Sequence, residues 1–267
     1  MVSVWHRIRK GVAGIGDTEW ALLGFETVGI VFGVLLAVQV GNWIEDRKEA
    51  REQRELIERL FEESQDVVAY ARADRDQFEA VQPRQIAALD ALVNSGNCPD
   101  RSGWYALSMT RFFPALSPPS AAYEEMIGSG GLGRLKDPDL IRAVSTYHSS
   151  FEEYTRQQDF FRDASIARGD RLYDLMPMEF DGETGVVGYR ETGFESACAS
   201  DDVKIDLISA YRSSAVIHNW RQGLAADAIR MCGALGRAVG KECVPTSGDP
   251  LSGDDLKIAQ GEESAPS

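Results

Sequence analysis

Residues 21–42 read ALLGFETVGIVFGVLLAVQVGN, an apolar stretch that holds one acid, Glu26, and no base. A helix rises about 1.5 Å per residue, so roughly twenty such residues cross the hydrocarbon core of a bilayer. Trp20 and Trp43 flank the stretch, where amphipathic rings prefer the membrane interface. The sequence therefore predicts a transmembrane helix over residues 20–43, with residues 1–19 as a cytoplasmic N-terminal segment and the lipid bilayer as a partner.

Two other interpretations fit this stretch less well. A cleaved signal peptide would explain the bases ahead of it, but the run is longer than a signal core and no small-x-small cleavage motif follows. A buried core helix would not explain why a tryptophan stands at each end of the run. We therefore expect a retained anchor that tethers the rest of the chain.

Small residues recur every four positions within the predicted span, at Gly29, Gly33, Ala37 and Gly41. Each step of four turns a helix by about 40°, so these residues form a band on which another helix can approach closely. Glu26 falls in the middle of the same band. The pattern predicts a helix–helix interface with a second copy or another membrane protein; the alternative for Glu26 is that its carboxyl reaches the membrane surface.

The composition narrows the functions that the rest of the chain can have. The 267 residues carry a net charge of −14, which disfavours binding to nucleic acid. His148 and Glu152 stand four apart, but two ligands do not make a metal site. The glycine-rich stretch 128–133 lacks the lysine of a phosphate loop. We expect no cofactor, no metal and no enzymatic activity.

Helical periodicity dominates the chain after the span, and we expect an all-α fold. Apolar residues three and four apart predict a helix from the span to Pro83, with residues 85–93 continuing or restarting it. Further helices are expected at 104–112, 120–127, 138–175 and 201–240, with a strand fragment at 186–187. Together they predict an antiparallel bundle over residues 44–245, and a disordered acidic tail over 246–267.

Charged residues along the helix that leaves the span stand four apart with opposite sign, which supports an exposed helix. Lys48 with Glu52 and Arg59 with Glu63 are two such predicted pairs.

Four cysteines, Cys98, Cys198, Cys232 and Cys243, allow three disulfide connectivities. In an oxidising compartment we favour Cys232 with Cys243, which would close a short loop at a helix end, and Cys98 with Cys198, which would join two loops. In a reducing compartment all four would stay unpaired as small buried hydrophobes.

Two features of the sequence favour opposite orientations of the large domain in the membrane. Basic residues on both sides of the span give a literal count that favours the large domain inside. The later bases alternate with more numerous acids, however, and long domains cross largely regardless of charge. We expect a cytoplasmic N-terminus in the bacterial inner membrane and a periplasmic domain.

The span and its exit resemble the N-terminal signature of an uncharacterised family of bacterial single-span membrane proteins. The resemblance lies in an acid before a glycine-punctuated apolar run that ends in Gln39-x-x-Asn42-Trp43 and then charge. The stretch from Tyr123 to Leu140 is similar to that family's Ser-Gly-Asn-Leu turn, with Gly131 where Asn is usual. The resemblance implies a largely helical membrane protein and brings no catalytic residues.

These features favour a membrane-anchored helical module that acts through protein contacts as a scaffold or sensor. The alternative is a tethered enzyme or small-ligand-binding protein with a pocket between helices. Four aromatic residues are the candidates to line such a pocket: Trp104, Phe112, Phe113 and Tyr147.

Overall fold

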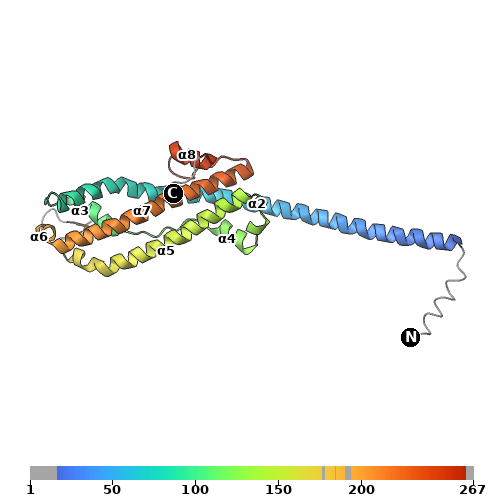
Figure 1. Ribbon diagram of the computed structural model, residues 1–267, viewed down its shortest axis with the longest axis horizontal. Coiled ribbons are helices and arrows are strands. Elements are labelled where there is room, and N and C mark those ends of the chain that lie inside the picture. The colour runs from blue at the N-terminus through green and yellow to red at the C-terminus, as the bar shows by residue number, and fades with distance from the viewer. Residues whose placement is uncertain (1–16, 176–177, 184, 190–193, 263–267) are drawn as a thin grey trace, which may run out of the picture. The chain divides into compact units, whose positions relative to one another are not determined.

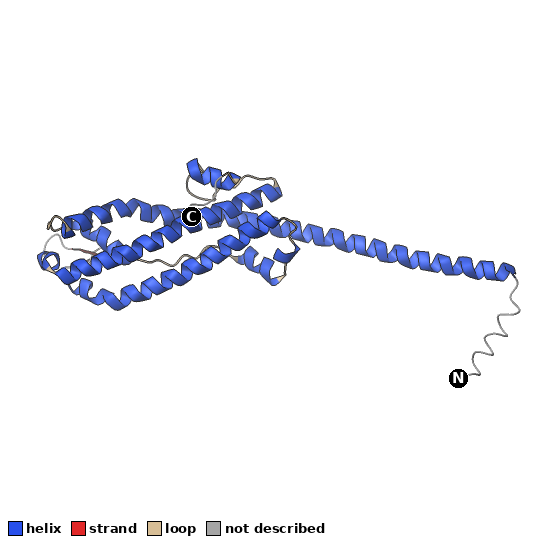
Figure 2. Ribbon diagram, in the orientation of Figure 1, coloured by secondary structure: helices blue, strands red, loops and turns tan. Residues whose placement is uncertain are grey.

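The computed structural model describes residues 17–175, 178–183, 185–189 and 194–262. Figure 2 shows that it is built almost entirely of helices, and the described residues add one short hairpin of strands. The chain divides into two compact units, residues 1–55 and residues 56–267. The second unit begins at Leu56, later than the predicted start at residue 44; residues 44–52 are exposed, and Leu56 is the first buried residue among the side chains that the structure describes.

The longest element is helix α2, Asp17–Val93, which belongs to both units (Figure 1). It runs through Pro83 without a break, so residues 85–93 continue the helix rather than restart it. Proline removes one backbone donor, and a long helix tolerates that loss when tertiary packing holds both sides. Phe78 before Pro83 and Gln85, Ala88 and Leu92 after it supply that packing, since all four are buried.

Two further long helices complete the main core. Helix α5 is Pro138–Leu175, as predicted, and Asp137 caps it by accepting hydrogen bonds from the backbone N–H groups of Asp139 and Leu140. Helix α7 is Asp201–Val239; the Ser200 hydroxyl caps its start and Gly240, at φ 73°, ends it. A left-handed residue at a helix end favours glycine, which explains that stop.

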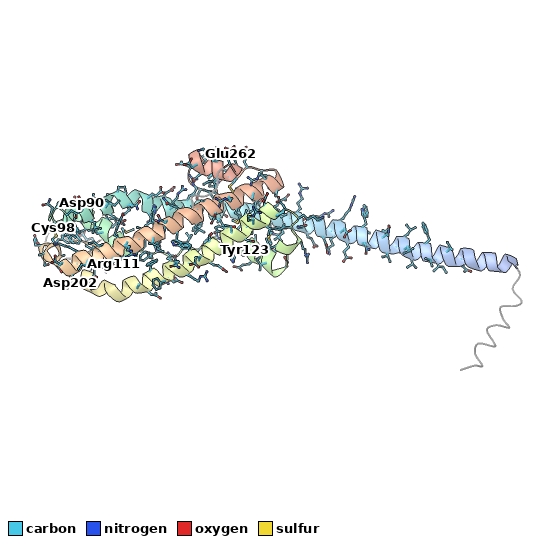
Figure 3. The ribbon with its side chains drawn as sticks, in the orientation of Figure 1. Asp90, Cys98, Arg111, Tyr123, Asp202 and Glu262 are labelled. Carbon is cyan, nitrogen blue, oxygen red and sulfur yellow. A yellow bond between two sulfur atoms is a disulfide. The ribbon has the colours of Figure 1, made fainter. Side chains whose placement is uncertain are left out.

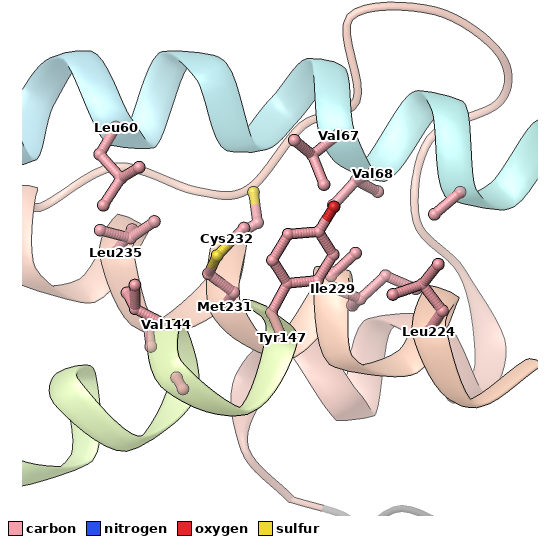
Figure 4. Packing of buried hydrophobic residues seen from close by; sticks show 14 of the residues in the cluster. Leu60, Val67, Val68, Val144, Tyr147, Leu224, Ile229, Met231, Cys232 and Leu235 are labelled. Atoms are coloured by element: carbon pink, nitrogen blue, oxygen red, sulfur yellow. The ribbon is translucent and has the colours of Figure 1, made fainter. Parts of the chain in front are cut away.

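The main core forms where α2, α5 and α7 face one another (Figure 4). Leu60, Val67 and Val68 from α2 meet side chains of the other two helices. The remaining labelled members are Val144, Tyr147, Leu224, Ile229, Met231, Cys232 and Leu235. The helical periodicity of the sequence thus marks the faces that become buried.

Short elements close the two ends of the second unit. Helix α3, Arg101–Ser108, continues into the 3-10 turn η1, Met109–Arg111; helix α4 is Ala121–Gly128 and is followed by η2, Leu132–Arg134. Strands β1, Met178–Asp181, and β2, Val186–Tyr189, pair antiparallel, so the strand predicted at 186–187 gains a partner. Helix α6, Glu195–Ala199, joins a second, smaller core around Trp104 and Phe194.

The prediction of a disordered tail is wrong for residues 246–262. Helix α8, Gly253–Gln260, packs on α7 with Ile258 and Ala259 buried. The packing depends on Gly233 of α7, where a Cβ atom would overlap the Ala259 carbonyl oxygen and lie 2.9 Å from its Cα. A segment with little apolar content can order here because a glycine lets its backbone come close. Residues 263–267 lie outside the described part.

Candidate functional site

The first unit presents an apolar helix that nothing in the described chain covers. Its large apolar side chains between Val28 and Ile44 keep 49–68% of their surface exposed. A helix that is apolar on all sides requires cover from lipid or from other helices. This is the one helix in the described residues that is long and apolar enough to cross a membrane, judged by length and composition.

The predicted interface residues all lie on this uncovered helix. Glu26, Gly29, Gly33, Ala37 and Gly41 are exposed. A Cβ atom built on any of the three glycines would meet no heavy atom within 4 Å. The structure therefore gathers these residues on one helix and leaves the space beside them open, and the interface itself stays a prediction.

Aromatic and charged side chains mark the end of the apolar run. The guanidinium of Arg47 lies 4.0 Å from the centre of the Trp43 ring, a cation–π contact. Lys48 and Glu52 form the predicted ion pair, at 3.6 Å. The side chain of Trp20 lies outside the described part of the molecule, so the predicted pair of flanking tryptophans is described at one end only.

The predicted pair of Arg59 with Glu63 is wrong, because both side chains turn to helix α4. Arg59 binds Glu125 at 2.7 Å. The Glu63 carboxylate accepts hydrogen bonds from the backbone N–H groups of Ala122 at 2.7 Å and Tyr123 at 3.2 Å. A carboxylate is stabilised at a helix N-terminus, where N–H groups lack partners within the helix. Spacing along one helix could not reveal this contact between helices.

A buried ionic cluster lies between the three long helices. Arg221 of α7 donates from Nε to Asp74 Oδ2 at 2.8 Å, and the two side chains are 0% and 10% exposed. Tyr154 of α5 donates its hydroxyl to the same oxygen at 3.3 Å. The Arg221 guanidinium lies over the Phe78 ring, 3.4 Å from its centre. One carboxylate thus joins all three helices of the main core.

The surroundings of this cluster shift the pKa values of its members. Burial raises the pKa of the Asp74 carboxyl, while Arg221 opposes that change by its charge and its hydrogen bond. Burial also raises the pKa of the Tyr154 hydroxyl, so the phenol stays protonated. Burial lowers the pKa of His218, Arg221 lowers it further and Glu79 opposes both. His218 is therefore neutral at pH 7.

Several polar atoms around this cluster have no hydrogen-bond partner among the described residues. They are Nη1 and Nη2 of Arg221, Nδ1 of His218 and Nε2 of Gln85. A cavity of about 10 Å³ lies beside Gln85 and His218. That volume holds about one water molecule, so the site has no room for a substrate. Its geometry fits a structural role, in which a buried ion pair fixes how the helices align.

The four aromatic residues predicted to line a pocket do not gather around one. Trp104 is fully buried in the smaller core and stacks on Phe194 with the ring centres 4.9 Å apart. Phe113 and Tyr147 belong to the main core, and Phe112 is 49% exposed. A cavity beside Phe113 measures only about 20 Å³.

The His148–Glu152 pair and the glycine-rich stretch 128–133 have structural roles in the described chain. His148 and Glu152 form an exposed pair at 3.1 Å, and the His148 ring stacks on Tyr123. No three His, Cys, Asp or Glu side chains among the described residues are grouped to bind a metal. In the glycine-rich stretch, Gly130 has φ 68° and makes a turn.

All four cysteines are paired, in the connectivity that we favoured for an oxidising compartment. Cys98 is bonded to Cys198, with Cα atoms 5.5 Å apart, and Cys232 to Cys243, at 5.6 Å. The first bond joins the loop after α2 to helix α6 (Figure 3 labels Cys98). The second bond ties the end of α7 to the loop that leads to α8. Both therefore hold connections between helices.

Comparison with protein-family models, with curated proteins and with solved structures finds no match to this chain.

Proposed function

We propose that this protein is a non-enzymatic, single-span membrane protein that acts through protein contacts as a scaffold or sensory module. The uncovered apolar helix around residues 28–44 carries the proposal, because an apolar surface of this size is stable only beside lipid or another helix. The second unit supports it with a well-filled core, because the cavity between α2 and α7 and the cavity between η1, α5 and α7 each have about the size of a water molecule.

The arrangement of the second unit as an antiparallel bundle is part of the proposal. Asp74 binds Arg221, whereas the earlier residue Phe61 lies near the later residue Gly236. Between α5 and α7, Ser150 donates to Asp227 at 2.6 Å, and Tyr154 lies near Arg221. In both helix pairs the residue numbers run in opposite directions, which supports a helix α7 that is antiparallel to α2 and to α5, while α2 and α5 run parallel to each other. Such a bundle offers long outer faces for partners.

We further propose that the protein resides in a bacterial inner membrane with its second unit in the periplasm. The two disulfides support this side, because disulfides persist in oxidising compartments and are rare in the cytosol. Protease added to intact spheroplasts should cleave the second unit. Protection of that unit until the membrane is ruptured would place it in the cytoplasm.

Self-association through the small-residue band of the span is the proposed mode of contact, with a second copy or another membrane protein as partner. Glu26 lies within this band, where a partner helix would cover its carboxyl. Helix α2 contains both the band and the first residues of the second unit.

Crosslinking in native membranes tests this contact. We expect Gly33→Leu to reduce the crosslinked dimer, because the larger side chain separates the two helices. Val31→Leu is the matched control: it also enlarges a side chain, but on the opposite side of the helix, and should leave the dimer unchanged. Equal crosslinking in both variants would remove the self-association proposal. Purification with Glu26→Ala then reports partners other than a second copy, whose loss would tie the acid to that contact.

A further inference from the structure

The C-terminal segment, residues 246–262, contacts α2 at three places: Thr246 donates to Asp66, the Asp249 carbonyl oxygen accepts from Arg72, and the Asp255 carboxylate anchors helix α8. Arg75 donates from Nη1 to Asp255 Oδ1 at 2.9 Å and from Nη2 to Oδ2 at 3.1 Å. Arg72 Nε lies 3.1 Å from Oδ2 of the same residue. These three side chains are only 14–17% exposed. Hydrogen bonds between such charged groups are stronger than neutral ones, and partial burial protects them from screening by salt.

Contacts with α7 fix the other end of helix α8. The helix approaches so closely over Gly233 that any side chain there would meet the backbone of Ala259. Arg237 of α7 donates from Nη1 to the Ala259 carbonyl oxygen at 2.7 Å, which satisfies a carbonyl in the last turn of α8. The surface below α8 therefore fits a closely approaching backbone at Gly233 and an acidic side chain at Arg72 and Arg75.

Helix α8 does not fill this surface. A cavity of about 500 Å³ lies between α7, the loop after it and α8. Its lining includes Arg237, Lys241, Val244, Leu251 and Leu256, and Leu256 remains 41% exposed. The space between α8 and the bundle is thus far larger than the cavities inside the core, which hold about one water molecule.

The length of α8 shows that its structure depends on docking. It has eight residues, and isolated helices shorter than about 12–15 residues are marginal in water. Gly248 and Gly253, at φ 82° and 55°, lie in the chain that leads to it. Detachment would therefore unfold α8 and uncover the surface, at the cost of the contacts with Asp255 and Ala259.

We propose that the surface of α2 and α7 below α8 is a docking groove for a short amphipathic helix of a partner protein, and that α8 occupies this groove in cis. The partner helix carries an acid that meets Arg72 and Arg75 and, four residues later, a small residue that fits over Gly233. Its apolar side chains enter the part of the cavity that α7 and the loop after it line, beside Arg237, Lys241 and Val244. Charge complementarity, the close approach at Gly233 and the unfilled space define this chemistry.

This inference rests on the proposed function only in treating the second unit as a contact-making module. It does not depend on contacts of the span. The groove test below uses purified chain and peptide, whereas the Gly33→Leu test measures crosslinking in membranes, so either can fail without the other.

The test measures binding of a labelled synthetic peptide, residues 250–262, to the full-length chain in nanodiscs by fluorescence anisotropy. In the Asp255→Asn variant, the chain's own α8 loses its charged contact with Arg72 and Arg75. The groove keeps both arginines, and the wild-type peptide keeps its aspartate. We expect this variant to bind the peptide at least about tenfold more tightly than the wild type, since hydrogen bonds to charged groups contribute that much or more. Hydrogen exchange at residues 253–261 should rise in the same variant.

Matched variants distinguish peptide binding in the groove from a general loosening of the second unit by the substitutions. Asp254→Asn removes a neighbouring acid whose side chain is 79% exposed, and should behave as the wild type. Adding Gly233→Ala to Asp255→Asn should abolish peptide binding, because the new methyl group blocks the groove. Gly223→Ala in the same helix, where a Cβ meets nothing within 4 Å, should leave binding unchanged.

Two results would overturn the proposal. Unchanged exchange in α8 of Asp255→Asn would show that this carboxylate does not hold the segment. Faster exchange without tighter peptide binding, or binding that survives Gly233→Ala, would show that the surface is not a docking groove.

Discussion

Residues 28–44 and residues 60–78 belong to the same helix, α2, yet they meet opposite environments. In the first region every large apolar side chain is about half exposed or more. In the second, Leu60, Phe61, Val67, Val68 and Phe78 are buried on one face, with charged residues on the other. Apolar content thus does not predict burial within the chain; its distribution around the helix does. A helix that is apolar on all sides is stable when lipid surrounds it, whereas a helix with an apolar stripe packs that stripe against neighbouring helices.

Loss of a disulfide should have the largest effect on the second region and none on the first. Replacing Cys98 and Cys198 by alanine frees a loop with a sequence separation of 100, and the chain-entropy estimate for such a loop is about 4.7 kcal/mol. Replacing Cys232 and Cys243, separated by 11, should cost about 2.8 kcal/mol. Urea unfolding of the full chain in detergent measures both. Equal losses for the two pairs would contradict this ranking.

Removal of Arg221 should be nearly as damaging, because it leaves the Asp74 carboxylate buried without its partner. We expect Arg221→Ala to lower the free energy of unfolding by about 3–5 kcal/mol. Arg212→Ala, at an exposed site on the same helix, is the matched control and should change it by less than about 0.5 kcal/mol. The double variant Asp74→Leu with Arg221→Met should recover most of the loss. A small effect of Arg221→Ala would show that the pair does not hold the helices together.

A charge in the first region should disturb membrane insertion and spare the second. Lysine at the middle of a span costs about 2.5–3.5 kcal/mol on insertion scales, so Leu35→Lys should lower the fraction of chain that resists carbonate extraction. Ala50→Lys, beyond the apolar run, should not. Loss of extraction resistance in both variants would mean that residues 28–44 are not what holds the chain in the membrane.

The smallest expected effect is a pH dependence that arises from His218 of α7, in the unit that packs around residues 60–78. The pKa of His218 is lowered in the folded chain, so the unfolded chain binds a proton more readily. This group therefore leaves stability unaffected above its ordinary pKa of 6.5, and stability falls as the pH drops from 6.5 towards the lowered value. The melting temperature should fall over this window, less so in His218→Gln. An identical slope in both chains would remove His218 as the cause. Asp74 has the opposite sign: its raised pKa favours the folded chain at low pH.

Sequence patterns predicted the elements that local chemistry determines. Helix α5 begins where Asp137 and Pro138 supply a cap and a fixed backbone angle. The stripes on α2 and α7 mark their buried faces. Glycine at 240 stops α7 as expected.

The features that sequence patterns missed depend on contacts between distant residues. Helix α8 forms because Gly233 lacks a side chain and because Arg72 and Arg75 lie near Asp255, which no local pattern reveals. Asp74 interrupts an apolar stripe, and the residue with which it pairs, Arg221, lies 147 positions later in the sequence. A signal for that site does exist: Ser214, His218 and Arg221 recur at helical spacing on the buried face of α7.

Spin-label accessibility tests the contrast between the two regions of α2 most directly. None of the four native cysteines is free, so a single cysteine can be introduced and labelled at Val31, Leu35 or the exposed residue Tyr70. In bilayers, labels at Val31 and Leu35 should be relaxed by oxygen, which dissolves in lipid, and shielded from a water-soluble nickel complex. The label at Tyr70 should show the reverse. Strong relaxation by nickel at Val31 and Leu35 would contradict the proposal that lipid covers this helix.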